Sequence, residues 1–231
     1  MATPVEIGAR FEQQGGTFVQ SPDAIAARLQ QIRALVFDWD GVFNKGEKAQ
    51  GLSSGFSEAD SMGINMLRYV FWRRDGHLPI AAIITGERNP SAEQFAQRER
   101  FHSLYQGVKD KGRAMASFRR RHGLEPAEIA CVFDDINDIA MAADCGLRIL
   151  VRRKASEMLR DYLVSSGRCD YVTASESGGY PVREAAELMM GFSGRFEEVV
   201  ASRCANDEAY RAYLVARQAI ALDAATADDV R

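Results

Sequence analysis

Carboxyl and hydroxyl side chains directly follow three short apolar segments of the sequence. They are Asp38 and Asp40 after residues 34–37, Thr85 after residues 80–84, and Asp134, Asp135 and Asp138 after residues 129–133. Ligands of an open α/β sheet bind beyond the carboxyl ends of its strands, so these groups would meet in one crevice. Each pattern alone also has a common structural explanation, as a turn or a helix cap. Their convergence on one crevice is what favours a catalytic or binding site over turns and helix caps.

Several carboxylates around one point repel each other, so they need a cation or raised pKa values. The groups at this point are oxygen ligands without cysteine or clustered histidine, which favours Mg²⁺, an ion that binds few carboxylates and keeps several waters. Lys111, at the start of a predicted helix, could contact an anion. An aspartate nucleophile, a second acid, a divalent ion, a hydroxyl and a lysine are the parts of phosphoryl transfer through an aspartyl phosphate.

The elements that would position these groups alternate along the chain. Short, continuous apolar segments are typical of strands buried on both faces, and they lie at residues 34–37, 80–84, 129–133, 147–151 and 171–172. Stretches with helical spacing lie between or beside them, at residues 21–32, 64–71, 110–122, 136–144, 155–165 and 181–190. This alternation predicts an α/β fold, with a Rossmann-like parallel sheet and helices on both faces.

We expect three parts in the chain. Residues 1–31 would form an amino-terminal arm, loose over its first 20 residues, and a short helix; residues 32–190 would form the catalytic core; and residues 191–231 would form a helical extension with an acidic, frayed end after Ala221. Four glycines interrupt the polar residues 41–59 after the first strand of the core, which predicts a β-hairpin flap or a flexible loop.

Composition excludes several classes of protein. The 231 residues include 29 Lys and Arg against 32 Asp and Glu, and the net charge of −3 argues against a nucleic-acid binder or a polybasic membrane anchor. The four cysteines fit no zinc or redox spacing, which favours a reducing compartment. No signal-peptide core is evident, and the longest apolar run, residues 78–84, is too short to cross a bilayer. We therefore expect a cytoplasmic protein.

The chain resembles the haloacid dehalogenase superfamily of phosphohydrolases. Its four motifs occur in order, as Asp38-Trp39-Asp40-Gly41-Val42, Ile83-Ile84-Thr85-Gly86, Lys111 and Asp134-Asp135-Ile136-Asn137-Asp138. Residues 56–67, 105–111 and 178–184 narrow the resemblance to the small phosphatases that act on 3-deoxy-octulosonate phosphate. The likeness covers about residues 32–190.

The resemblance implies a role for each matching residue. Asp38 would be the nucleophile, and Asp40 the general acid and base, with its backbone carbonyl also binding Mg²⁺. Asp134 would be the third contact of the ion, with Asp135 and Asp138 nearby and Asp138 orienting other groups. Thr85 and Lys111 would hold the phosphoryl oxygens, and the substrate-binding candidates are Gly86, Glu87 and Arg98.

Some positions depart from the octulosonate phosphatases. Glu87 stands where they usually have arginine, which is similar to the related ketodeoxynononate phosphate phosphatases, and Arg98 matches a basic residue that accompanies this glutamate. A surface glutamate and a surface arginine are the equally open alternative. Phe133, Pro181 and the pair Asn44-Lys45 replace a glycine, a glycine and a Thr-Asp pair. These changes bear on the substrate rather than on the reaction.

The two places where larger superfamily members insert a cap are short in this chain. Neither residues 41–59 nor residues 86–110 could form a separate domain, so water would reach an uncovered site. The resemblance implies a homo-oligomer, a tetramer, whose neighbouring subunit covers the site. We therefore expect a phosphatase of an eight- or nine-carbon keto-deoxy sugar-acid phosphate. A capless protein phosphatase, covered by its large substrate, and a catalytically silent assembly domain are the alternatives.

Overall fold

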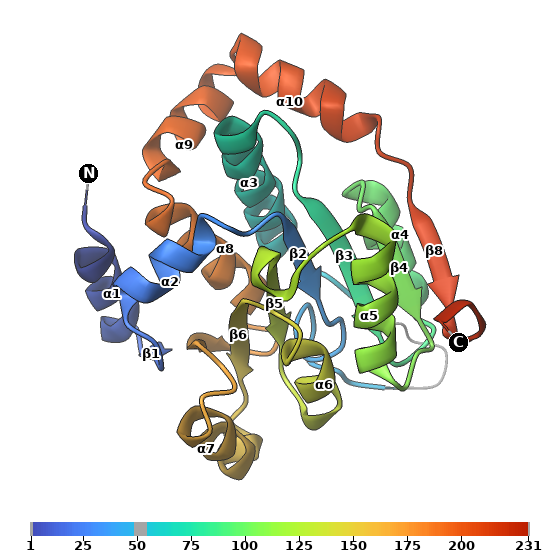
Figure 1. The fold of residues 1–231 in the computed structure, drawn as a ribbon. Helices are drawn as coiled ribbons and strands as arrows, with labels where there is room; N and C mark the ends of the chain where they lie inside the picture. The colour runs from blue at the N-terminus through green and yellow to red at the C-terminus, as the bar shows by residue number, and fades with distance from the viewer. Residues whose placement is uncertain (1, 49–54, 231) are drawn as a thin grey trace.

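A computed structural model describes residues 2–48 and 55–230, and its centre is one eight-stranded sheet (Figure 1). The strand order is β1-β7-β6-β5-β2-β3-β4-β8. All neighbours pair in parallel except β1 and β7, which are antiparallel. The strands are β1 Thr17–Phe18, β2 Ala34–Phe37, β3 Ile80–Thr85, β4 Ser103–Gln106, β5 Ile129–Phe133, β6 Leu147–Arg152, β7 Tyr171–Glu176 and β8 Asp223–Thr226.

Helices cover both faces of the sheet, which confirms the predicted fold class (Figure 1). They are α1 Pro4–Gln13, α2 Pro22–Leu29, α3 Glu58–Asp75, α4 Pro90–Arg98, α5 Lys111–His122, α6 Ile139–Ala142, α7 Glu157–Ser165, α8 Pro181–Phe192, α9 Phe196–Ala205 and α10 Glu208–Gln218. Apolar residues of α2, α3, α4 and α8 to α10 share one core cluster, and those of α5 to α7 share the other.

Strand β2 lies at the centre of this arrangement because all four of its side chains are buried. Leu35 and Phe37 point into one core cluster, and Ala34 and Val36 point into the other. Strand β2 pairs with β3 on one side and with β5 on the other. The residues that follow these three strands therefore emerge side by side at one edge of the sheet.

Two terminal segments are more ordered than the sequence predicts. The expected loose arm contains helix α1, whose N-cap Thr3 and Glu6 form a reciprocal capping box, and strand β1. The expected frayed end after Ala221 contains strand β8 and the 3₁₀ turn Ala227–Val230. Both predictions were wrong for the same reason, because these segments become ordered through pairing and packing with distant parts of the chain.

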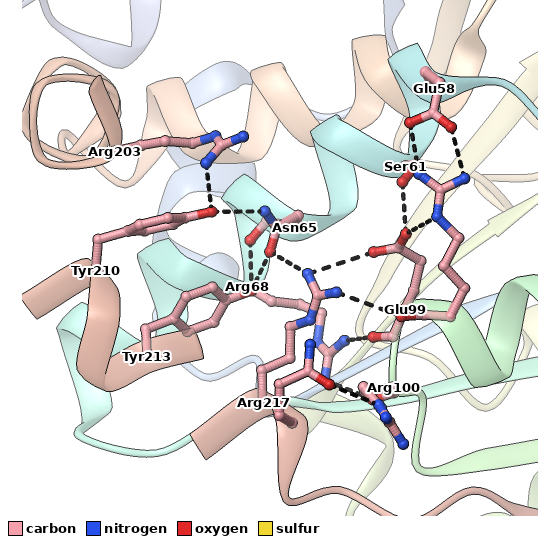
Figure 2. A network of polar contacts seen from close by, with 12 residues as sticks. Glu58, Ser61, Asn65, Arg68, Glu99, Arg100, Arg203, Tyr210, Tyr213 and Arg217 are labelled. Carbon is pink, nitrogen blue, oxygen red and sulfur yellow. Dashed lines mark hydrogen bonds and ion pairs between the residues drawn. The ribbon is translucent and has the colours of Figure 1, made fainter. Parts of the chain in front are cut away.

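The carboxyl-terminal helices run across α3 before β8 pairs with β4 (Figure 1). A buried polar network holds α10 on α3 (Figure 2). The Tyr213 hydroxyl donates to the backbone oxygen and to Oδ1 of Asn65, both at 2.8 Å, and Arg217 Nη1 donates to the same Oδ1 at 2.7 Å. Arg68 is fully buried, and its guanidinium donates to the backbone oxygens of Glu99 and Arg100.

The predicted flap falls partly on residues 49–54, which lie outside the described residues. Within residues 40–48 and 55–57, the structure has one isolated bridge, between Asp40 and Asn44, and no named strand. Over the described parts of the chain, no helix has the length and apolar character needed to cross a membrane.

Candidate active site

Three buried carboxyl groups converge where β2 and β5 end. Asp38 follows β2, Asp134 follows β5, and Asp138 ends the 3₁₀ turn Ile136–Asp138. One oxygen of each lies within 4.8 Å of the others, and they are the metal-ligand cluster that the described residues form. The sequence prediction that these acids meet at the carboxyl ends of neighbouring strands is confirmed.

Lys111 provides a positive charge to this cluster from the first turn of α5. Its Nζ donates to Asp38 Oδ1 at 2.5 Å and also to Asp138 Oδ1. Burial opposes the charge of Lys111, but the two carboxylates outweigh it and raise the pKa of the ammonium. Burial and the neighbouring charge of Asp138 raise the pKa of Asp38 well above its usual range, although Lys111 acts in the opposite direction.

Asp138 shapes the loop as well as contacting Lys111. Its Oδ2 accepts the backbone N–H of Asp134 at 3.4 Å and that of Asp135 at 3.2 Å. Asp135 is half-buried, and its carboxylate accepts the N–H of Ile136 at 2.7 Å. Both oxygens of Asp138 therefore have donors, which leaves Asp38 and Asp134 as the acids with room for a cation.

The environment of Asp134 fits a divalent ion. Its side chain is 1% exposed, and its Oδ1 is buried with no hydrogen-bond partner among the described residues. Its Oδ2 accepts a hydrogen bond from Arg153 Nη2. Burial raises the pKa of Asp134 to about 6, although Arg153 opposes this rise. A buried carboxylate oxygen without a donor is a position that a hard cation would satisfy.

Arg153 is a site residue that the sequence analysis missed. It follows β6 directly, and β6 lies beside β5, so its side chain reaches Asp134 from the neighbouring strand. The strand-end rule that selects Asp38 and Asp134 applies equally to Arg152-Arg153-Lys154 after the fourth apolar run. Applying the rule to that run would have found it.

One further acid, a hydroxyl and a glycine of the predicted site follow or end strands β2 and β3. Asp40 is half-buried and forms an ion pair with Lys48 at 2.5 Å. Thr85 ends β3, is buried, and its Oγ1 accepts the N–H of Glu87 at 3.4 Å. Gly86 follows it and is half-buried. Asp40 and Thr85 therefore emerge from the neighbouring strands β2 and β3 at the same edge of the sheet as Asp38, and Lys111 contacts the Asp38 carboxylate.

Glu87 and Arg98 have separate partners instead of contacting each other. Exposed Glu87 forms an ion pair with Lys109, whose hydrogen bond lowers the pKa of this carboxyl. Arg98 donates two hydrogen bonds to Glu58, each of 2.6 Å, and its guanidinium lies 5.7 Å from the ring centre of Phe56. Glu87 and Arg98, which the resemblance associates with each other, therefore belong to two different ion pairs in this structure.

Comparison with known proteins finds relatives that share one name. No family model matches the chain. The 3-deoxy-D-manno-octulosonate 8-phosphate phosphatase of Escherichia coli strain K12 is 26% identical over 178 residues, which cover 75% of this chain and 87% of that protein. The crystal structure of the phosphatase of the same name from Yersinia pestis is 30% identical, with a TM-score of 0.63 over 76% of this chain and 89% of that one.

A third relative shares the fold. The phosphatase from Moraxella catarrhalis, in complex with magnesium, phosphate and 3-deoxy-D-manno-octulosonate, is 24% identical, with a TM-score of 0.65 over 78% of this chain and 98% of that chain. At this identity the likeness concerns the arrangement of helices and strands.

Proposed function

This chain belongs to the haloacid dehalogenase superfamily, among the phosphatases similar to 3-deoxy-D-manno-octulosonate 8-phosphate phosphatase, and we propose that it hydrolyses the phosphomonoester of an eight- or nine-carbon keto-deoxy sugar acid through an aspartyl phosphate. The observation that carries the proposal is the buried Asp38 carboxylate, held by Lys111 beside Asp134 and its unpartnered Oδ1. Those relatives are named for an octulosonate phosphate, and the substrate here is inferred by analogy with them.

We propose that Mg²⁺ is the cofactor and that Asp38, Asp134 and the backbone carbonyl of Asp40 would hold it. When bound, the ion would supply charge that offsets the anionic phosphoryl group. Asp138 already accepts three hydrogen bonds, which supports an orienting role for it. Magnesium in the structure of the Moraxella relative supports the same choice of ion.

The residues of this chain would carry the reaction in two displacements. In the first, an oxygen of Asp38 attacks phosphorus, the bond to the leaving oxygen breaks, and Asp40 gives that oxygen a proton. In the second, Asp40 takes a proton from water, the water oxygen attacks phosphorus, and the bond to Asp38 breaks, which releases phosphate. The Thr85 hydroxyl and the Lys111 ammonium would bind the phosphoryl oxygens throughout.

Substrate choice is proposed to depend on residues at the rim. Glu87 would accept hydrogen bonds from sugar hydroxyl groups, with Gly86 beside it, and Arg98 would face the sugar. Glu87 repels a carboxylate, so a cation must hold the acid group of the substrate. Lys109, which contacts Glu87, is a candidate for this contact in addition to Arg98.

A substrate panel tests the reaction class. Sugar-acid phosphates of eight and nine carbons, phosphopeptides and an aryl phosphate are offered to the protein with Mg²⁺ or with excess chelator. We expect Mg²⁺-dependent release of phosphate from a sugar-acid phosphate. Preference for phosphopeptides would instead support the capless protein phosphatase, and no turnover of any compound would support a silent assembly domain.

Asp38→Asn tests the nucleophile. The amide keeps the shape of the side chain but replaces the carboxylate with an uncharged group that is a very weak nucleophile, so we expect turnover to fall by at least about a thousandfold. Acid quenching of wild type with ³²P-labelled substrate should trap a protein-bound phosphate that the variant lacks. Asp23→Asn, at an exposed position in the first turn of α2, is the matched control and should keep full activity. Turnover by pure Asp38→Asn at the wild-type rate would refute the mechanism.

A further inference from the structure

Arg153 is a half-buried positive charge that the proposed reaction does not use. Its side chain is 31% exposed and belongs to the loop after β6, yet its Nη2 contacts Asp134, and its Nε is buried without a hydrogen-bond partner among the described residues. A surface ion pair would leave the guanidinium in water. Arg153 instead extends inward to a carboxylate proposed to bind the metal ion.

The loop after β2 leaves room for this contact. Gly41 has a φ of +93°, and a Cβ atom at this position would collide with both Asp134 Oδ2 and Arg153 Nη2. Ser177 Oγ donates to the backbone oxygen of Gly41 at 2.6 Å and holds the loop in place. The glycine therefore allows the backbone to close over the pair, and the ion pair is part of the wall of the site.

Different acids of the site pair with different basic residues. Lys111 contacts Asp38 and Asp138, whereas the cation in contact with Asp134 is Arg153. A buried carboxylate without a counter-charge is costly, so Arg153 stabilises Asp134 in the metal-free protein. A divalent ion on Asp134 would meet the same guanidinium at close range, and the two positive charges would repel each other.

We propose that Arg153 is the counter-ion of the metal-free site, which Mg²⁺ displaces from Asp134 on binding, so that Arg153 sets the metal affinity of this protein. The inference rests on the proposed Mg²⁺ site of Asp38 and Asp134. Arg153 is a positioning residue here: it holds the metal-free carboxylate in place and lowers the affinity for the ion. An orienting role, in which Arg153 aims Asp134 at the ion, would have the opposite effect on affinity.

Calorimetric titration of the metal-free protein with MgCl₂ tests the proposal without any substrate. Arg153→Gln keeps a donor for Asp134 but removes the charge, and we expect its Kd for Mg²⁺ to fall about tenfold or more. Its Tm without metal should be lower than that of wild type, and saturating Mg²⁺ should reduce the difference. Arg153→Lys, which keeps a cation, should remain closer to wild type.

Lys154→Gln is the matched control. Lys154 is the next residue, its side chain is 83% exposed, and it pairs with Glu176 rather than with the acid cluster. This variant removes the same charge nearby and should change the Kd by less than about twofold. An unchanged or weaker Mg²⁺ affinity in folded Arg153→Gln would overturn the proposal, and a weaker one would favour the orienting role.

Crystal structures of wild type with and without Mg²⁺ provide a second measurement that does not depend on how the variants fold. We expect Arg153 Nη2 to leave Asp134 when the ion is bound, and an intact ion pair in the Mg²⁺ complex would refute the displacement. If wild type binds no Mg²⁺ by either method, the proposed metal site itself fails. If wild type binds Mg²⁺ and Arg153→Gln binds it with the same affinity, the metal site stands and only the inference about Arg153 fails.

Discussion

Glu87 illustrates how a single residue can separate substrate choice from phosphoryl chemistry. It is exposed at the rim and contacts Lys109, while Asp38 and Lys111 are buried below it. We expect Glu87→Ala to lower kcat/KM for the sugar-acid phosphate by roughly ten- to a hundredfold, because the proposed contact that orients the sugar would be lost. Hydrolysis of a simple aryl phosphate should barely change. Steady-state kinetics on both substrates measure the difference.

The control for this prediction is Glu93→Ala on the adjacent helix α4, where the carboxylate accepts a hydrogen bond from Gln97. It should leave both substrates unaffected. Equal losses on both substrates in Glu87→Ala would place Glu87 in the phosphoryl-transfer machinery. No loss on either would show that Glu87 is a surface residue paired with Lys109.

His102 makes the folded state sensitive to acid. The Ala81 N–H donates to its Nδ1 at 3.1 Å, and burial, helped by the charge of Arg68, lowers its pKa from 6.5 to about 4. The native state therefore favours neutral His102, so its contribution to stability is complete above pH 6.5 and is lost as pH falls toward 4. Between pH 7 and 4.5 this loss should be about 2 kcal/mol.

Denaturant unfolding of wild type and His102→Gln across this pH range measures the effect. The glutamine oxygen can still accept the Ala81 N–H, so we expect the variant to lose less stability than wild type on acidification. The raised pKa values of Asp38 and Asp134 act in the opposite direction in both proteins, and they cancel in the comparison. Parallel stability curves would contradict the prediction.

The candidate site was largely predictable because its acids directly follow strands. Asp38 and Asp134 follow continuous apolar runs that could be recognised without any tertiary information. The partners of Glu87 and Arg98 were not predictable, because Lys109 and Glu58 approach them from other elements. Local sequence determines which residues reach the edge of the sheet, and strand order determines which charges meet there.

At the scale of elements, the missed segments show what local patterns do not contain. Strand β8 has the sequence Asp-Ala-Ala-Thr, with little of the β-branched and aromatic character of strands, and it exists through its pairing with β4. Helix α1 did carry a local signal, since Thr3, Pro4 and Glu6 form a capping box with proline in the first turn. The proposed boundaries at residues 32 and 190 remain predictions.

Tyr213 and Arg217 of helix α10 both contact Asn65 of α3, which makes this attachment testable (Figure 2). Tyr213→Phe removes the hydroxyl that donates to the backbone oxygen and Oδ1 of Asn65 while keeping the buried ring. We expect the free energy of unfolding to fall by about 1–2 kcal/mol, the cost of hydrogen bonds lost from a buried group. Urea unfolding monitored by circular dichroism measures this loss. Exposed Tyr162→Phe is the control, and an equal effect there would contradict the assignment.

At the scale of the whole molecule, the two edge strands of the sheet come from the two ends of the chain. Strand β1 covers β7 and strand β8 covers β4, so copies of the molecule are not expected to assemble by pairing β4 or β7 edges. Exposed apolar side chains are our candidates for a contact between subunits. Ile136, between two acids of the site, is 65% exposed, and Tyr180, before α8, is 51% exposed.

Tyr180 is our candidate for the subunit contact. It has a left-handed backbone with φ of 64° and ψ of 47°, an unusual conformation for an aromatic residue, and it holds an exposed ring beside the Gly178–Gly179 turn. Because the chain has no cap, we expect a homo-oligomer, a tetramer, with the 41–59 flap and residues 178–190 near a subunit boundary. Light scattering coupled to size-exclusion chromatography measures the mass of the wild-type particle.

Tyr180→Asn tests this contact, since asparagine tolerates the left-handed backbone and the variant should fold. We expect a smaller particle and a lower kcat/KM for the sugar-acid phosphate, because separated subunits leave the site open to water. Tyr162→Asn removes an aromatic ring that is 50% exposed on α7 and should alter neither property. Dissociation without loss of activity would show that each subunit covers its own site. A wild-type monomer would remove the shared-site argument and favour a large substrate, such as a phosphoprotein, that covers the active site itself.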